Sequence, residues 1–440
     1  MVDLKNLSQL YNNDEFNSAF MRLKEMFCIA KNNKDELSKI IDIYLVPQDI
    51  EKKQNAEVST PYILRKEMIS KIPDDFWKSP RKVFEPCAGK GGFLLDIINK
   101  FMDGLQELYE DEEERYRIIV EECIYWAEFN STNVYICKLL LDPFGKYKLN
   151  YNEGDTLQLN IKEKWAIDGF DAVIGNPPYN DATGNKGKGH CIWVNFVEKA
   201  FKEWLNKDAY LLYVHPAVWR QVNHPLQKII KERQIIYLEI HNIEDGLKVF
   251  KCSTRYDWYL IQNRDCTEKT IIKCEDGIIE EENLLEWDYI PNMMFNELKD
   301  LCNSNIKLDV WRYRSTYSTE NKKLVAKIKN NDYKYPLIYT INKANDISYR
   351  YTNNNTLGHF NKSKFIFSNG AGFICDNTGE YGLTEWAYCI YDIKENLEMI
   401  KDCFRSNKFN KVKKAIQLDS STYNIKVMKY FKKEFYKEFI

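Results

Sequence analysis

Residues 170–179 read FDAVIGNPPY, and this segment joins an apolar strand to an unusual polar end. The residues up to Gly175 are mostly apolar, which is typical of a strand buried on both faces of a parallel sheet. Asn176, two prolines and Tyr179 follow at once. Proline has no N–H group and a fixed φ, so the turn is stiff and its carbonyl oxygens are acceptors without a competing local donor. The segment therefore predicts a buried strand that ends on a rigid, ligand-facing turn.

Strand-like and helix-like runs alternate on both sides of this segment. Helices are expected after each early strand, for example over residues 92–101, 131–141 and 193–205. Such alternation predicts an α/β fold, a Rossmann-like and doubly wound sheet whose strands are mostly parallel. The expected strands cover residues 82–86, 123–128, 170–175, 209–216, 235–240 and 256–262.

Three parts are expected along the 440 residues. Apolar positions at helical spacing, such as Phe20, Leu23, Met26 and Phe27, predict a helical segment over residues 1–55. The α/β domain is assigned to 56–285. Beyond it the alternation fades, and short strand-like runs among Asn, Tyr and Lys predict a mixed α+β domain over 286–440.

Composition excludes several classes of protein. Hydrophobic residues make up 44 % and charged residues 29 %, which indicates a folded chain. There is neither an apolar run of membrane-spanning length nor an N-terminal secretory pattern, so we expect a cytoplasmic protein without a membrane partner. The twelve cysteines include no Cys-x-x-Cys pair, which argues against a metal site.

Charge is distributed unevenly, although the formal net charge is only −2. Residues 401–440 carry eleven Lys and Arg against four Asp and Glu. This run is either a solvated helix face or a surface that follows phosphates, and charge alone does not decide between them.

The strand expected over residues 82–86 carries an acid near its end, and a glycine-rich turn follows it. Glu85 closes the strand, and Gly89 and Gly91 allow a tight turn into a helix and a close approach of backbone to ligand. No third glycine follows at dinucleotide spacing. An acid at the strand tip favours a cationic group, such as the ammonium of an amino acid, over a pyrophosphate.

Two further acids follow later strands. Glu128, at the end of the second strand, is suited to the hydroxyls of a ribose. Asp155, in the polar turn GDTL, is suited to the amino group of an adenine. Together with Glu85 they predict a pocket for an adenosine joined to an amino acid, which is the description of S-adenosylmethionine.

The Asn-Pro-Pro-Tyr turn now has a chemical interpretation. The side-chain oxygen of Asn176 and the carbonyl of Pro177 can accept both hydrogens of an exocyclic amino group. That grip favours a pyramidal nitrogen and stabilises the positive charge that develops during methyl transfer. Tyr179 offers a flat surface on which a base can stack.

With these motifs the sequence resembles the gamma class of N6-adenine-specific DNA methyltransferases over roughly residues 58–263. The resemblance implies the class I methyltransferase sheet, a C-terminal DNA-recognition domain and S-adenosylmethionine as cofactor without a metal. It implies a catalytic set of Asn176, Pro177, Pro178 and Tyr179. The cofactor residues that it implies are Thr60, Glu85, Pro86, Gly89, Gly91, Phe93, Glu128, Asp155, Thr156 and Asn176.

The resemblance also implies how the target is held. Tyr179 and, through a looser match, Phe250 would flank a flipped-out adenine, since a base inside the duplex is out of reach of the methyl donor. Lys186 and Lys188, in the Gly-rich loop 180–190, would contact DNA phosphate. Double-stranded DNA is the expected partner, with a separate cognate restriction endonuclease in a bacterial or viral restriction–modification setting.

Other interpretations stay open at this point. Asn-Pro-Pro-Tyr also occurs in enzymes that methylate a glutamine amide or an RNA base, although the glutamine enzymes lack the Thr60-Pro61 element and a long C-terminal domain. A DNA-binding protein that kept the fold without catalysis is a further alternative. Cytosine-N4 enzymes usually begin this turn with serine, so Asn176 favours adenine.

Overall fold

The computed structural model describes residues 59–142, 144–179, 191–312, 317–356, 359–419 and 421–439. The helices expected within residues 1–55, and Lys186 and Lys188, lie outside the described residues. The chain divides into two compact units. Unit 1 comprises the described residues up to Pro216 with Pro225–Lys273 and Glu281–Glu286, and unit 2 comprises Ala217–His224, Cys274–Glu280 and the chain from Trp287 onward.

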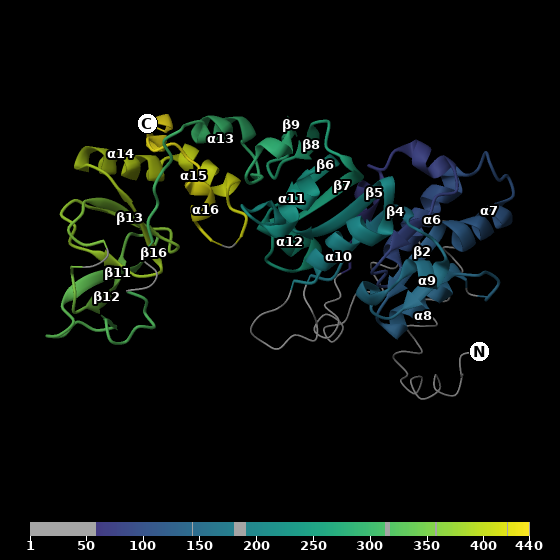
Figure 1. Ribbon diagram of the computed structural model, residues 1–440, viewed down its shortest axis with the longest axis horizontal. Helices are drawn as coiled ribbons and strands as arrows, with labels where there is room; N and C mark the ends of the chain where they lie inside the picture. The colour runs from purple at the N-terminus through teal and green to yellow at the C-terminus, as the bar shows by residue number, and fades with distance from the viewer. Residues whose placement is uncertain are drawn as a thin grey trace. The chain divides into compact units, whose positions relative to one another are not determined.

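The sheet of unit 1 has the strand order β3-β2-β1-β4-β5-β7-β6-β8-β9 (Figure 1). β3, β2, β1, β4 and β5 run parallel, and β7 lies antiparallel between β5 and β6. The strands are β1 Val83–Glu85, β2 Ile124–Glu128, β3 Asn150–Glu153, β4 Phe170–Gly175, β5 Leu205–Pro216, β6 Arg233–His241, β7 Tyr256–Asp265, β8 Thr270–Lys273 and β9 Ile279–Glu282.

This topology confirms the predicted α/β class I methyltransferase sheet. From β1 the chain moves outward to β2 and β3, then returns to place β4 on the other side of β1. The strand order therefore reverses between β1 and β4, and the carboxyl ends of strands at such a point form the usual ligand crevice of an open α/β sheet.

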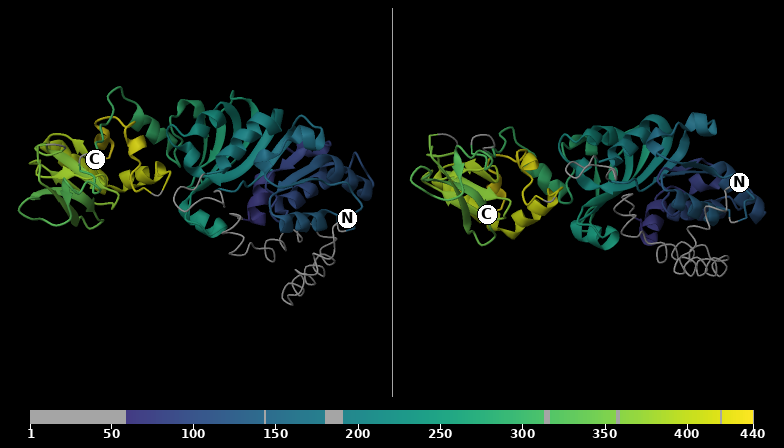
Figure 2. Two further views of the ribbon diagram at one scale, coloured as in Figure 1. Left: turned by 60° about the horizontal axis from the view of Figure 1, so that its bottom comes forward. Right: turned by 90° about the horizontal axis from the view of Figure 1, so that it is seen from below.

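Helices lie on both faces of this sheet (Figure 2). Because both faces are covered, β1 and almost all of β4 are buried, as the near-continuous apolar sequence predicted. The helices are α5 Tyr62–Ile69, α6 Gly92–Gly104, α7 Glu112–Ile118, α8 Ser131–Leu141, α9 Ile161–Trp165, α10 Trp193–Lys199, α11 Pro225–Lys231 and α12 Ile243–Phe250.

Unit 2 contains two small sheets. Its first sheet has the order β10-β12-β11-β15, and its second has the order β14-β13-β16. The strands are β10 Val325–Ala326, β11 Tyr335–Ile341, β12 Ile347–Thr352, β13 Lys364–Ser368, β14 Phe373–Asp376, β15 Gly382–Leu383 and β16 Ala387–Tyr391. The helices are α13 Phe295–Cys302, α14 Lys394–Arg405, α15 Asn407–Ala415 and α16 Ile425–Met428.

The predicted domain boundary at 285/286 lies one residue before the end of the last segment of unit 1, Glu286. Unit 2 also takes in Ala217–His224. The fully buried Arg220 accounts for this, because its guanidinium donates to the carbonyl of Ile290 at 2.9 Å and to Asn292 at 2.8 Å. Cutting the chain at 285 would leave this buried cation without either acceptor.

In the described part of the chain, no helix combines the length and apolar character needed to cross a membrane.

Candidate active site

The carboxyl ends of β1, β2 and β4 bring the predicted site residues to one edge of the sheet. Glu85 ends β1, Glu128 ends β2 and Asn176 follows β4, and these strands are direct neighbours. Burial raises the pKa of the Cys87 thiol, and the carboxylates of Glu128, Glu85 and Asp155 raise it further. The three acids predicted from separate motifs therefore act electrostatically on the same residue of the turn after β1.

The glycine turn after β1 has the backbone that its sequence predicted. Gly89 has φ +52° and Gly91 has φ +83°, and Gly91 caps the N-terminus of α6. A Cβ atom at Gly91 would lie 3.2 Å from the Cys137 sulfur and 3.2 Å from Leu140, so a side chain there meets the packed interior. A Cβ atom at Gly89 would meet nothing within 4 Å. Gly89 thus faces open space, where a ligand can approach the backbone.

Glu85 is a buried acid with unused acceptor capacity. It is 2 % exposed, and its Oε2 atom has no hydrogen-bond partner among the described residues. Burial raises its pKa well above the usual range, the Arg65 guanidinium opposes this, and Glu128 and Asp96 raise it further. A buried carboxyl in this state gains stability from a cationic group placed beside it. The donor set therefore fits the ammonium group of an amino-acid ligand.

Backbone N–H groups orient the carboxylate of Glu128. Gly89 donates to one oxygen at 2.8 Å and Asn130 to the other at 2.8 Å. A carboxylate has about four acceptor sites, so these bonds fix its direction without exhausting it. The bond from Gly89 also ties the glycine turn after β1 to the end of β2.

Asp155 and Thr156 shape the neighbouring turn. The exposed Asp155 caps the short 3₁₀ helix Thr156–Gln158 by accepting from the N–H of Leu157 at 2.9 Å. The buried Thr156 hydroxyl donates to the carbonyl of Pro86 at 2.8 Å. Thr156 therefore joins this turn to the glycine turn, whereas Asp155 keeps an exposed carboxylate at the edge of the site.

Thr60 and Asn176 contact each other directly, which the sequence did not show. The amide Nδ2 of Asn176 donates to the Thr60 hydroxyl at 3.1 Å. Because Nδ2 is the donor in this bond, the orientation of the amide is set, and the acceptor Oδ1 points away from Thr60. Thr60 thus has a second role besides the predicted one, because it orients the predicted catalytic amide.

Arg65 is a positioning residue that the sequence did not indicate. Its guanidinium is 2 % exposed, binds Asp96 at 2.6 Å and donates to the carbonyl of Thr60. It also lies against Gly92, where a Cβ atom would come within 2.7 Å of its Cζ atom. Arg65 therefore fixes the Thr60 segment on α6. An arginine at helical spacing in α5 carries no sequence signal for this role.

The Tyr179 ring ends the described part of the turn. Its hydroxyl is buried and has no partner among the described residues. Burial raises the pKa of this phenol well above 10, and Cys252, Tyr256 and Asp257 raise it further. The phenol is therefore neutral at any physiological pH, and the segment after α12 lies beside the ring.

Phe250, expected to flank the target base, lies in the core in this structure. It is 6 % exposed and packs edge-on against Tyr256, with 4.8 Å between ring centroids. Phe93, expected beside the cofactor, is likewise buried, at 4 % exposure. By contrast, Phe129 directly follows Glu128 and is 68 % exposed. An exposed aromatic ring beside the predicted ribose acid is a stacking surface, and the sequence analysis passed over it.

An ionic cluster lies behind Tyr256 at the end of β6. The His241 ring stacks on Tyr256 at 4.3 Å and lies 3.2 Å from Glu239, which also binds Lys273 at 2.9 Å. Burial alone would raise the pKa of Glu239, but His241, Lys273 and the Tyr237 hydroxyl together lower it to about 2. This cluster fixes the end of β6 against the start of β7, where Tyr256 pairs with His241.

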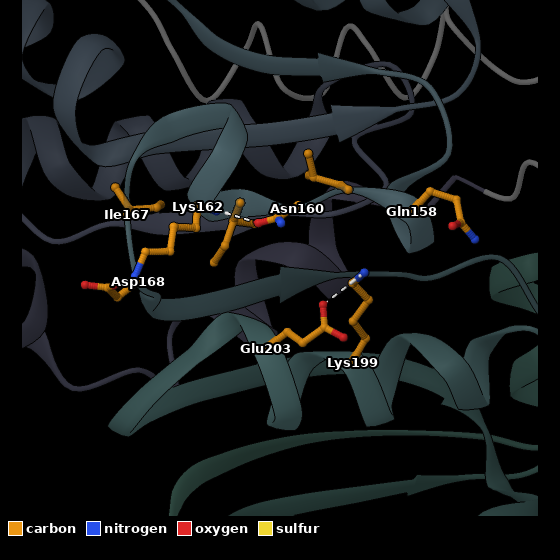
Figure 3. A pocket seen from close by; sticks show the side chains of 9 residues that line it. Gln158, Asn160, Lys162, Ile167, Asp168, Lys199 and Glu203 are labelled. Atoms are coloured by element: carbon orange, nitrogen blue, oxygen red, sulfur yellow. Dashed lines mark hydrogen bonds and ion pairs between the residues drawn. The ribbon is translucent and has the colours of Figure 1, made fainter.

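A hollow of about 300 Å³ lies beside the segment that follows β3, the segment that also holds Asp155 and Thr156 (Figure 3). Lys199 pairs with Glu203 at 3.1 Å and Lys162 with Asp168 at 2.8 Å at its border. The residues that line it begin with Gln158, two positions after Thr156, and include none of the predicted cofactor residues. Its charged groups are paired with each other, so it is a surface feature beside the site.

Comparisons with known proteins agree with this geometry. Residues 105–250 match the profile of the Eco57I restriction-modification methylase family. The Type IIL restriction-modification enzyme MmeI, solved with DNA, aligns with a TM-score of 0.51 and 11 % identity, over 93 % of this chain and 67 % of that chain. A DrdV–DNA complex aligns with a TM-score of 0.51 and 10 % identity, over 91 % and 59 %. No curated protein matches.

The match to a modification subunit of a putative type I restriction enzyme from Vibrio vulnificus YJ016 has a TM-score of 0.40 and 14 % identity, over 55 % of this chain. The alignment spans about half of that subunit, 53 %. At such identities a solved structure shows the fold alone, and the MmeI and DrdV alignments, each with a TM-score of 0.51, do so. The family match over residues 105–250 confirms the expected resemblance to a restriction-modification methylase.

Proposed function

We propose that this chain, whose residues 105–250 match the Eco57I restriction-modification methylase family, transfers a methyl group from S-adenosylmethionine to the N6 atom of a flipped-out adenine in DNA. The observation that carries the proposal is the bond between Asn176 and Thr60, which presents an oriented amide at the end of β4, next to the ligand-like turn after β1.

The residues of the chain fit the proposed cofactor. Glu85 would accept from the ammonium group, Glu128 from the ribose hydroxyls, and Asp155 from the adenine amino group. Gly89 leaves the space that a close approach requires. When bound, the cofactor supplies an activated methyl group on a sulfonium.

The chain's own contribution to catalysis lies in two acceptors. Asn176 Oδ1 and the carbonyl of Pro177 would hold the two hydrogens of the target amine. No described residue donates to the Pro177 carbonyl, so its acceptor capacity is available to a substrate. Two fixed acceptors favour the state in which the nitrogen carries positive charge, and they need no reorganisation at the moment of transfer.

Binding of the target base would use Tyr179. The ring offers its face for stacking, and its neutral phenol adds no charge beside a nitrogen that becomes cationic. Lys186 and Lys188, in the loop after Tyr179, remain predicted contacts to phosphate, whereas the buried Phe250 is not proposed as a contact to the base. The C-terminal unit would bind and read the surrounding duplex.

The decisive experiment combines substitution with product analysis. Full-length protein is incubated with labelled S-adenosylmethionine and plasmid DNA, and the digested nucleosides are identified by mass spectrometry. Asn176→Ala should lower turnover by about 100- to 1,000-fold, the usual effect of removing one transition-state contact, with cofactor affinity within a few-fold of wild type.

Thr60→Val provides a matched test of the amide's orientation. It keeps the shape of Thr60 but removes the acceptor for Asn176 Nδ2, so turnover should fall while Tm changes little. Near-normal turnover of Asn176→Ala would refute the catalytic role. Methylcytosine as the product would show that the target base is cytosine and not adenine. Label that appears only in RNA or protein would reject DNA as the substrate.

A further inference from the structure

In unit 2, β11 and β12 form a hairpin (Figure 1). An arginine of this hairpin stacks on one of its tyrosines. The guanidinium carbon of Arg350, in β12, lies 3.9 Å from the ring centroid of Tyr339, in β11. One nitrogen of Arg350 donates to the carbonyl of Tyr349 at 2.8 Å. Arg350 forms no ion pair with any carboxylate in the described part of the chain. A guanidinium that is held in place but has no anionic partner is prepared to bind one.

A β-bulge sets the direction of Tyr339. Leu337 pairs with Arg350 and Ile338 with Tyr349, and the register then shifts before Thr340 pairs with Ser348. Tyr339 is therefore the additional residue on β11. Bulges re-aim one side chain of a strand and often occur at functional positions. Here the ring that the bulge re-aims is Tyr339, and the guanidinium of Arg350 stacks on it.

The two faces of the hairpin differ. Ile338 and Ile341 are fully buried in a core cluster together with the partly buried Tyr349. On the other face Leu337, the cross-strand pair of Arg350, is fully buried in a second core cluster, whereas Arg350 is partly exposed and Ser348 is exposed. Trp386, whose ring centroid lies 6.5 Å from that of Tyr339, is 46 % exposed. Beyond Leu337, this face thus combines a cation with the exposed ring of Trp386 and the partly buried ring of Tyr339.

The turn of the hairpin is rigid. The amide oxygen of Asn342 accepts from the N–H groups of Ala344 and Asp346, both at 2.9 Å. A Cβ atom at Gly372 would lie 1.9 Å from the carbonyl of Asn342, so the neighbouring β13–β14 turn packs directly against the hairpin. Arg350 therefore projects from a fixed ribbon.

An exposed lysine lies in this turn. Lys343, between Asn342 and Ala344, is exposed and forms no ion pair within the described residues. An ammonium group that is held on a rigid turn and is not paired with a carboxylate is suited to phosphate.

We propose that the β11–β12 hairpin enters the DNA major groove, where Arg350 reads a guanine and Lys343 contacts the phosphate backbone. The major groove admits a two-stranded β-ribbon, and an arginine fork bonded to O6 and N7 of guanine is the commonest specific contact there. The stack on Tyr339 fixes the plane of the fork, as bidentate binding requires. This inference rests on the proposed DNA methyltransferase function and predicts a required G·C pair in the recognition sequence.

The test maps methylated sites for full-length wild type, Arg350→Ala and Lys343→Ala on the same plasmid library by single-molecule sequencing. The wild-type consensus should contain an invariant guanine besides the methylated adenine. Arg350→Ala should accept any base at that position, lose about 10- to 100-fold in rate on the original sites and keep every other position. Lys343→Ala should lose affinity on all sites with the consensus unchanged.

A folding defect is separated from a reading defect by two measurements. Each variant's Tm is compared with that of wild type, and Arg350→Lys, which keeps the charge but lacks the fork, should relax the same position. If wild type methylates DNA and Arg350→Ala retains the guanine requirement, the inference is wrong while the proposed function stands. If wild type methylates no DNA, the proposed function itself fails.

Discussion

Replacing Gly89 with alanine separates the cofactor site from the stability of the fold. A Cβ atom there would meet nothing within 4 Å, so the methyl group causes no clash within the described protein. The cost in stability comes from the backbone, because Gly89 has φ +52° and a left-handed conformation costs an alanine about 1 kcal/mol. We therefore expect Tm to fall by only a few °C.

The effect on ligand binding should be much larger. If the open space above Gly89 receives the cofactor, the added methyl group occupies the volume of the ligand. Overpacking of this kind costs about 1–3 kcal/mol, which corresponds to about 10- to 100-fold in Kd. Calorimetric titration of the full-length protein with S-adenosylhomocysteine measures it.

Gly145 supplies the matched control. It has φ +67° and also faces open space, so Gly145→Ala carries the same backbone cost. It lies after α8, the helix that leads back from the carboxyl edge of the sheet, and hence away from the site. Gly91→Ala should destabilise more, since its Cβ meets Cys137 and Leu140 at 3.2 Å. The reasoning is refuted if Gly89→Ala and Gly145→Ala bind the ligand equally well.

Three further outcomes follow from the buried ionisable groups. Because the pKa of Glu85 is raised in the free protein, binding of a cationic ligand should release a proton from its carboxyl group, and ligand affinity should increase with pH. Calorimetry in buffers of different ionisation enthalpy should show this proton release in wild type and not in Glu85→Gln. Glu239 has its pKa lowered from 4.5 to about 2, so it stabilises the fold above pH 4.5 and loses this effect as the pH falls toward 2. Denaturant unfolding of Glu239→Gln should therefore show a loss of up to ~3 kcal/mol at pH 7 that shrinks over that range, and a loss independent of pH would contradict the assignment. Tyr179→Phe removes a buried hydroxyl that has no partner among the described residues and keeps the ring, so turnover and Tm should stay near wild type. Tyr179→Ala removes the ring as well and should raise KM for DNA. A large loss of turnover in Tyr179→Phe would instead assign the phenol a chemical role.

Local sequence determined most of the sheet and the positions of its ligand-facing turns. An apolar run such as FDAVIG is stable only when buried, and Asn-Pro-Pro-Tyr must then end the strand. Gly89 and Gly91 likewise predicted a tight turn into a helix, and in the structure both have a positive φ within that turn. The strand β3 was missed, because NYNE lies at the edge of the sheet and carries no buried apolar pattern.

Tertiary structure decided which of these residues act together. Thr60 and Asn176 are 116 positions apart, and their contact arises because β4 returns beside β1. Arg65 became a structural link through Asp96 and Gly92, and Phe250 was placed in the core where the sequence predicted a target contact. In unit 2, the bulge that directs Tyr339 toward Arg350 depends on the register between two strands. Backbone preferences and burial act over a few residues and can be read from the sequence, whereas side-chain pairing across strands depends on register and packing, which only the folded chain determines.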